Sequence, residues 1–155
     1  MVSEINFLDI EENSGYKNFI EQIIEKCFEE EDLNCSSLYV NVILTTPAHI
    51  KEINKKYRNI DKETDVLSFP MFEKSEINQV IESKNQDILG DIVISIEQVK
   101  KQAEEYEHSF NRELAYMVVH GFYHLMGYYH IEEEDKKIMR SKEENILSKI
   151  GVERV

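Results

Sequence analysis

Three histidines, His120, His124 and His130, are the residues of this chain whose types and spacing are best suited to chemistry. They form the pattern H-x-x-x-H-x-x-G-x-x-H, in which the glycine is Gly127. Neutral imidazoles bind zinc, and a site with three protein ligands leaves the fourth position of the ion free for water. The spacing therefore predicts one Zn²⁺ ion per chain, held by these three side chains, with an open position for reaction.

A predicted helix must position the first two histidines. The stretch from Asn111 to Met126 is apolar on nearly every face, which is typical of a buried helix. His120 and His124 are four residues apart, so they should lie about one turn apart on a shared face. Gly127 can then adopt the left-handed conformation that ends a helix, and the chain can turn to bring His130 toward the other imidazoles.

Other interpretations of the histidines stay open at this point. They could be unrelated residues of a packed helix and turn, or they could belong to a closed structural zinc site. The closed site needs a fourth ligand, and neither Cys27 nor Cys35 lies near this segment in sequence. A zinc peptidase is the weaker alternative, because metzincin peptidases share this spacing but carry a glutamate where this chain has Gly121.

The run ELAYMVVHGFYHLMGYYH, from Glu113 to His130, resembles the signature of the YbeY family, bacterial metal-dependent endoribonucleases that act in ribosomal RNA maturation. The resemblance extends upstream to YRNIDKETDVLSFP, which ends at Pro70, and to LGDIVIS, which ends at Ser95. It covers most of the chain after residue 38. One position departs from the family pattern: the family usually has aspartate just before its last histidine, where this chain has Tyr129. The departure leaves the three zinc ligands in place and removes a carboxylate next to them.

The resemblance implies a zinc-dependent endoribonuclease that cleaves single-stranded RNA, acts on the small-subunit ribosomal RNA precursor and contributes to ribosome quality control. The implied partners are that RNA and the small ribosomal subunit or its assembly factors, with no DNA and no membrane. Arg58 matches the arginine of the family's YR block, and it is therefore assigned as a catalytic residue that holds a phosphate with two hydrogen bonds. A surface arginine after a helix end is the alternative for Arg58. A ribosome-associated assembly factor with a structural metal is the alternative function.

The general base is not assigned by the sequence. With glycine at position 121, the proton must go to metal hydroxide, to a nearby carboxylate or to the hydroxyl of the RNA itself. Asp65, Ser68 and Asp91 lie in the matching blocks, but caps and sheet-edge residues would look the same. We do not assign them as catalytic.

Charge argues against a nucleic-acid substrate at first sight. The net charge of the 155 residues is −13, whereas nucleic-acid binders normally carry a basic footprint. Basic residues nevertheless cluster in one short stretch, at Lys51, Lys55, Lys56, Arg58 and Lys62. The cluster is compatible with a phosphate-binding rim, and a solvated helix face is its alternative interpretation.

Composition predicts one globular domain over residues 1–155, a metal-dependent endoribonuclease domain by the resemblance. Hydrophobic residues make up 41% of the chain, and the first thirteen residues lack the basic and apolar regions of a secretory signal. No apolar run approaches the roughly 20 residues of a membrane span. The expected location is the cytoplasm.

Periodicity predicts the remaining elements. Strands are expected near Ile5 to Ile10, Leu38 to Leu44, Asp65 to Phe69 and Ile88 to Ser95. Helices are expected at Ser14 to Asp32, Pro47 to Arg58, 96 to 106, Asn111 to Met126 and Glu132 to Lys149. Tyr57 and Ile138 should face inward on their helices, and Glu73 to Asp87 should be a loop or an excursion from the sheet. The order predicts an α+β fold (α/β-like), with a small mixed four-stranded sheet and about five helices in a single domain.

Overall fold

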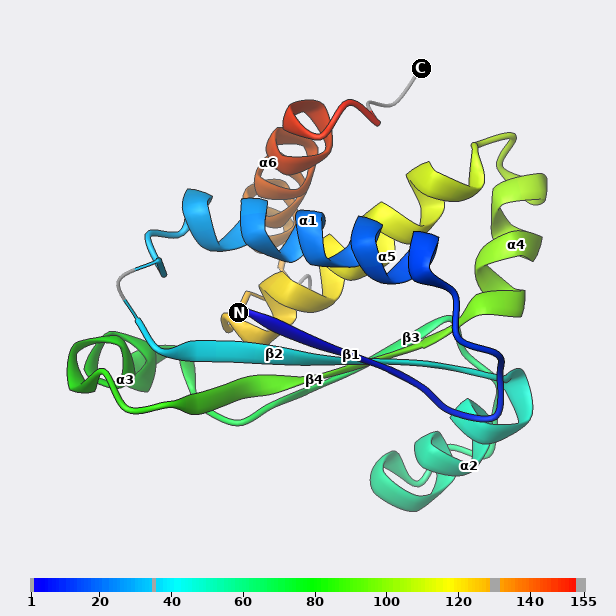
Figure 1. Cartoon of the computed structure of the whole chain (residues 1–155), viewed down its shortest axis with the longest axis horizontal. Helices are drawn as coiled ribbons and strands as arrows, with labels where there is room; N and C mark the ends of the chain where they lie inside the picture. The colour runs from blue at the N-terminus through cyan, green and yellow to red at the C-terminus, as the bar shows by residue number, and fades with distance from the viewer. Residues whose placement is uncertain (1, 35, 129–131, 153–155) are drawn as a thin grey trace.

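A computed structural model describes residues 2–34, 36–128 and 132–152, and its centre is a four-stranded sheet in the order β1-β2-β4-β3 (Figure 1). The strands are β1 (Ser3–Phe7), β2 (Leu38–Thr45), β3 (Val66–Pro70) and β4 (Asp87–Ser95). β1, β2 and β4 are parallel, and β3 pairs with β4 in the antiparallel direction. The expected mixed sheet is confirmed.

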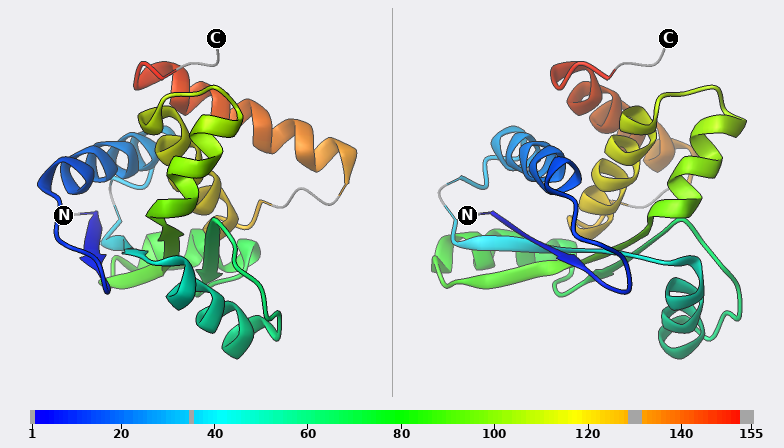
Figure 2. Two further views of the ribbon diagram at one scale, coloured as in Figure 1. Left: turned by 90° about the vertical axis from the view of Figure 1, so that its right-hand side faces the viewer. Right: turned by 45° about the vertical axis from the view of Figure 1, so that its right-hand side comes forward.

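Helices cover both faces of the sheet (Figure 2). On one side lie α1 (Ser14–Glu30), α4 (Ile96–Glu105), α5 (Phe110–Leu125) and α6 (Glu133–Lys149), and on the other lies α2 (Pro47–Arg58). Successive side chains of a strand point to opposite faces. Ile92 of β4 accordingly joins the large core under α1 and α5, whereas Val93 packs with Ile50 of α2. α2 and α5 are therefore separated by the sheet.

Side-chain caps fix where the helices begin. The Thr46 hydroxyl accepts a hydrogen bond from the His49 N–H at 3.2 Å, with Pro47 at the first helical position, as the sequence predicts. The Ser109 hydroxyl accepts from the Arg112 N–H at 3.1 Å and starts α5. This cap fixes the residue at which the helix that carries the two histidines begins.

The expected loop from Glu73 to Asp87 is wrong in part. It contains a 3-10 turn, η1 (Lys74–Glu76), followed by the short helix α3 (Ile77–Ser83). The described residues thus form six α-helices, where the sequence predicted about five. The buried side chain of Ile77, with Val80 and Ile81 packed against the core, stabilises a helix too short for its apolar spacing to stand out among polar neighbours.

Two side chains expected to face inward are exposed. Tyr57 is 64% exposed and Ile138 is 48% exposed. On α2 the buried polar position is Asn54, whose amide donates to the Lys62 carbonyl oxygen at 3.0 Å. On α6 the buried residues are Met139, Glu143, Ile146 and Leu147. A carboxylate therefore lies on the apolar face of α6.

Among the described residues, no helix combines the length and the apolar character needed to cross a lipid bilayer.

Candidate metal centre

The imidazoles of His120 and His124 converge on one face of α5. Their Nε2 atoms lie 3.0 Å apart, and the rings are nearly perpendicular, with centroids separated by 4.5 Å. In a tetrahedral zinc site with Zn–N distances of 2.0–2.1 Å, two ligand nitrogens lie about 3.3 Å apart. The two rings would therefore need to separate by only a few tenths of an ångström, so this donor pair fits a zinc ion.

The third predicted ligand, His130, lies outside the described residues, as does Tyr129. Within residues 2–34, 36–128 and 132–152, no three His, Cys, Asp or Glu side chains come together as a metal site. The described residues thus supply two of the three expected imidazoles.

Gly127 ends the histidine helix with a left-handed backbone, as predicted. Its φ angle is +91°, and its N–H donates to the His124 carbonyl oxygen at 3.0 Å. A Cβ at this position would lie 2.5 Å from the Cβ of Lys74 in η1. Both the φ angle and the close approach of η1 therefore require glycine where the chain leaves α5 toward His130.

Glu143 of α6 lies behind the first histidine, and no sequence motif predicted it as part of the site. Its Oε2 is 2.6 Å from Nδ1 of His120, and its side chain is 8% exposed. Carboxylate partners of this kind commonly orient metal-binding imidazoles. The available signal was a carboxylate between Met139 and Ile146 on the apolar stripe of α6.

Gly121 is packed against the sheet. A Cβ placed on it would lie 2.9 Å from Cγ2 of Ile92. A glutamate here, at the position of the metzincin base, would enter the contact between α5 and β4. The fold itself therefore excludes a carboxylate base at this position.

An ionic and aromatic network lies beside the histidine helix. Lys142 Nζ is 3.2 Å from Oε2 of Glu31, and the Tyr123 hydroxyl donates to the same oxygen at 3.2 Å. Burial lowers the pKa of Lys142, but Glu31 and Tyr128 together raise it by more, so the net shift is upward. Burial and Glu31 together raise the pKa of Tyr123 above its usual value of 10.0. Lys142 is thus held in its charged form next to Glu143.

Two lysines flank the ring of Tyr128, just beyond Gly127. Lys74 Nζ lies 4.2 Å from the ring centroid and Lys142 Nζ lies 5.1 Å from it. Cations at such distances are attracted to the face of an aromatic ring. Lys142 is also paired with Glu31, so positive charge at this end of the histidine helix comes mainly from Lys74.

Arg58 lies apart from the histidine face. It is the last residue of α2, on the opposite side of the sheet from α5, and its side chain is exposed. The basic cluster predicted at 51–62 is also exposed on and just after this helix. The structure thus brings His120 and His124 together without Arg58, whose contact with phosphate stays a prediction.

The two aspartates of the matching blocks have structural partners. Asp65 accepts from the Val66 N–H at 2.7 Å through Oδ1 and from the Gln102 amide at 3.1 Å through Oδ2. Asp91 accepts from the Asn41 amide at 3.0 Å. Ser68 is half-buried in β3, opposite Ile92 of β4. The hydrogen bonds of the two aspartates are structural, in agreement with leaving both unassigned as catalytic residues.

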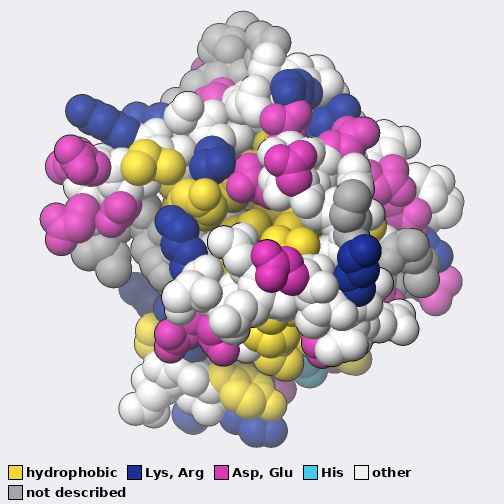
Figure 3. All heavy atoms as spheres, turned by 90° about the vertical axis from the view of Figure 1, so that its left-hand side faces the viewer, with side chains coloured by type: hydrophobic (Ala, Val, Ile, Leu, Met, Phe, Trp, Pro, Cys, Tyr) yellow, Lys and Arg dark blue, Asp and Glu magenta, His cyan; other side chains and the backbone are white. Residues whose placement is uncertain are grey.

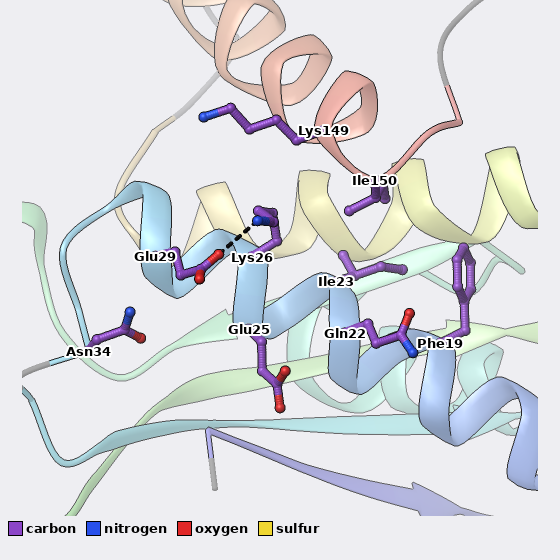
Figure 4. Close-up of a pocket in the computed structure, with 9 residues that line it drawn as sticks. All are labelled: Phe19, Gln22, Ile23, Glu25, Lys26, Glu29, Asn34, Lys149 and Ile150. Atoms are coloured by element: carbon purple, nitrogen blue, oxygen red, sulfur yellow. Dashed lines mark ion pairs between the residues drawn. The ribbon is translucent and has the colours of Figure 1, made fainter.

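Two hollows lie away from the histidines. One, of about 560 Å³, runs between α1 and the end of α6 and contains the Lys26–Glu29 ion pair at 2.8 Å (Figure 4). The other, of about 620 Å³, lies between α2 and the sheet, where Ile53, Phe69 and Met71 contribute apolar side chains. His49, Glu52, Lys56 and Asp91 also line this second hollow, so it combines apolar and titratable side chains on the α2 side of the sheet.

Charges of both signs are mixed on the surface. Figure 3 views the molecule from the α3 end of the sheet and shows hydrophobic side chains at its centre, with acidic and basic side chains interspersed around them. This face has no field of a single sign. Attraction of a polyanion would depend on individual lysines.

The family model described as Endoribonuclease YbeY matches residues 4–151 of this chain. The chain belongs to the YbeY family. The match includes the described histidines and Glu143, and it confirms the resemblance that the histidine motif carries.

Several YbeY proteins are similar over most of their length. The Endoribonuclease YbeY of Caldicellulosiruptor bescii is 42% identical over 153 residues, which cover 92% of this chain and 97% of the relative. The Endoribonuclease YbeY of Fusobacterium nucleatum is 44% identical over 149 residues, with 96% and 88% covered. The solution structure of TM1509 from Thermotoga maritima has a TM-score of 0.60 and 28% identity, and it covers 95% of this chain and 91% of its own.

Proposed function

We propose that this chain is a zinc-dependent endoribonuclease that cleaves single-stranded RNA, and that residues 1–155 form a single domain for this activity. The observation that carries the proposal is the 3.0 Å approach of the His120 and His124 Nε2 atoms in a YbeY chain. Two imidazoles aimed at one point beside a buried carboxylate are a donor set suited to a transition metal.

His120, His124 and His130 would hold the metal. When bound, zinc supplies a Lewis acid for a phosphoryl oxygen and lowers the pKa of its water from 15.7 toward about 7. Glu143 would orient the imidazole of His120, and the packing at Gly121 keeps a carboxylate base out of α5. The packing at Gly121 therefore places the base elsewhere, and a nearby carboxylate, the hydroxide that a bound metal would supply or a hydroxyl of the RNA could take the proton.

Positive charge near the histidines would bind the RNA backbone. Lys74 and Lys142 lie over the ring of Tyr128, so a phosphate bound there could contact an ammonium group. Arg58 is proposed to bind a phosphate of the same strand outside the histidine face, because α2 lies across the sheet. Lysines in this arrangement would offset the overall charge of −13 locally.

The finer assignments follow the family. We propose that the cellular substrate is the small-subunit ribosomal RNA precursor, that the partners are the small subunit or its assembly factors, and that the protein acts in the cytoplasm. Ribosome quality control would follow from the same cleavage activity.

The test is cleavage of labelled RNA by purified protein after chelation and after zinc is restored. We expect cleavage of a single-stranded RNA only in the presence of metal, with much slower cleavage of the same sequence in a duplex and none of the matching DNA. Binding to small subunits without any metal-dependent cleavage by the zinc-loaded protein would instead support the assembly-factor alternative.

A further inference from the structure

We infer that Glu143 is a positioning residue of the metal centre, which selects the tautomer of His120 through a hydrogen bond from Nδ1. The selected tautomer leaves the Nε2 lone pair aimed at His124. This inference rests on the proposed metal site and adds a residue outside the histidine motif to it.

The direction of the hydrogen bond follows from the chemistry of the two groups. An ionised carboxylate can only accept, so the hydrogen of the 2.6 Å contact must belong to Nδ1 of His120. A neutral imidazole carries a single hydrogen, so its Nε2 is then an acceptor. That atom lies 3.0 Å from Nε2 of His124. The carboxylate on one side of the ring therefore makes the other side ready to bind a metal.

Packing supports the orientation of the ring. Tyr116, one turn earlier on α5, stacks on His120 with centroids 5.5 Å apart and an interplanar angle of 30°. Glu143 is 8% exposed and His120 is 18% exposed, so water competes little for their contact. A buried, charge-assisted hydrogen bond of this length is strong enough to hold one ring orientation.

The same geometry separates positioning from catalysis. Glu143 contacts the Nδ1 side of the ring, whereas the converging nitrogens lie on the Nε2 side. Its carboxylate therefore stands behind the ligand, where it can orient the ring but cannot take a proton from a molecule bound between the histidines.

A simple helix-to-helix contact is the competing explanation, and the chain contains a matched control for it. Glu144, the next residue of α6, forms an ion pair with Arg112 of α5 at 3.3 Å. Both carboxylates thus join the same two helices, but only Glu143 contacts the face that carries the converging imidazoles. Loss of Glu144 tests the effect of helix attachment alone.

The experiment compares zinc affinity of Glu143→Leu, Glu143→Gln and Glu144→Gln with the wild-type protein, by competition with a coloured chelator. Removal of such a carboxylate typically weakens metal binding by about 10- to 100-fold, and we expect this loss for Glu143→Leu. Glu143→Gln should lose less, because its amide oxygen can still accept from Nδ1. Glu144→Gln should stay within about threefold of wild type.

A second readout uses the metal-free proteins and does not depend on zinc. Nitrogen-15 NMR of the histidine rings should show His120 as the Nδ1–H tautomer in the wild type and in Glu143→Gln, and a changed tautomer population in Glu143→Leu. The inference is overturned if wild-type His120 is the Nε2–H tautomer, if Glu143→Leu binds zinc like wild type, or if Glu144→Gln loses as much affinity. If the wild-type protein itself binds no zinc, the proposed function is overturned instead. The two failures are distinguishable, because the first is seen in the variants or in the tautomer and the second in the zinc affinity of the wild type.

Discussion

The Nε2 atoms of His120 and His124 lie 3.0 Å apart on a helix whose remaining faces fill the core. α5 packs against α1, α4, α6 and the sheet, so its position is fixed by most of the fold. The histidine pair therefore depends on packing contacts that carry no chemistry themselves, and substitutions at those contacts should change metal binding.

Replacement of His124 by alanine should remove most of the zinc affinity and leave the fold intact. The side chain is only half-buried, and loss of a direct ligand should cost more than the roughly 10- to 100-fold that loss of an indirect partner costs. Chelator competition and circular dichroism measure the two effects. His49→Ala, on α2 across the sheet, is the control and should bind zinc normally. Equal losses in both variants would contradict histidine ligation at this site.

Gly127→Ala should lower both stability and zinc affinity. The new Cβ would combine a positive φ of +91° with a 2.5 Å approach to Lys74. Gly151→Ala is the matched control, because that residue also has a positive φ, +81°, but its Cβ would meet nothing within 4 Å. The control should lose only the strain of the backbone, about 1 kcal/mol, whereas Gly127→Ala should lose about 1–3 kcal/mol more in urea unfolding. Similar losses would show that the contact with η1 is unimportant.

Gly121→Ala should destabilise the protein through its contact with β4. Overpacking typically costs about 1–3 kcal/mol, and replacement of a helical glycine by alanine returns about 1 kcal/mol, so the net loss should be at most about 2 kcal/mol. Ile92→Val removes the Cδ1 atom that a new Cβ would approach to 3.2 Å and should relieve part of the clash. A double-mutant cycle measures this coupling. Strict additivity of the two substitutions would contradict the close approach.

Stability should fall in alkaline solution. Burial raises the pKa of the Cys27 thiol above its usual value of 9.0, and burial with Glu31 raises the pKa of Tyr123 above 10.0. The unfolded chain therefore releases these protons first, so the stabilisation is complete below pH 9 and is lost as pH rises further. Urea unfolding between pH 8 and 10 should show this slope. Cys27→Ala should flatten its first part, and an unchanged slope would exclude Cys27 as the source.

Arg58→Glu should weaken RNA turnover far more than it weakens folding, with zinc affinity unchanged and a loss of at most about 1 kcal/mol from the reversed charge in the last turn of α2. The residue is exposed at the end of α2, so its replacement removes few packing contacts. Lys17→Glu, at an exposed position of α1, makes the same change in net charge and is the control. Turnover measured at several salt concentrations should fall for Arg58→Glu alone. If both substitutions lower turnover equally, Arg58 acts only through the overall charge of the protein and does not contact a phosphate directly.

Local signals in the sequence predicted most of the fold. Thr46 with Pro47, the apolar helix around His120 and the glycine at position 127 each specify backbone geometry through nearby residues, and the structure agrees. α3 was not predicted, because a seven-residue helix offers too few apolar positions for a clear helical period. The prediction that Tyr57 faces inward was wrong, because the buried position near the end of that helix belongs to Asn54.

The site was predictable only where its residues are neighbours along the chain. The spacing of His120 and His124 fixes their shared face, but Glu143 is 23 residues beyond its histidine partner and its pairing depends on how α6 crosses α5. The sequence does show a carboxylate on an apolar stripe, which indicates a buried partner without identifying it. Arg58 was assigned to the site from a motif block, but it lies on the other side of the sheet from the histidines. The order of motif blocks along a chain does not show on which face of the sheet each block lies.

The pairing of α5 with α6 gives the site an order of assembly. While the protein is being synthesised, a chain that has emerged only through α5 already carries His120 and His124, but it lacks the carboxylate that sets the first ring. It also lacks His130, so tight metal binding would require the chain just beyond α5 as well as the docking of α6. The site would thereby be completed only after translation of the chain has passed that helix.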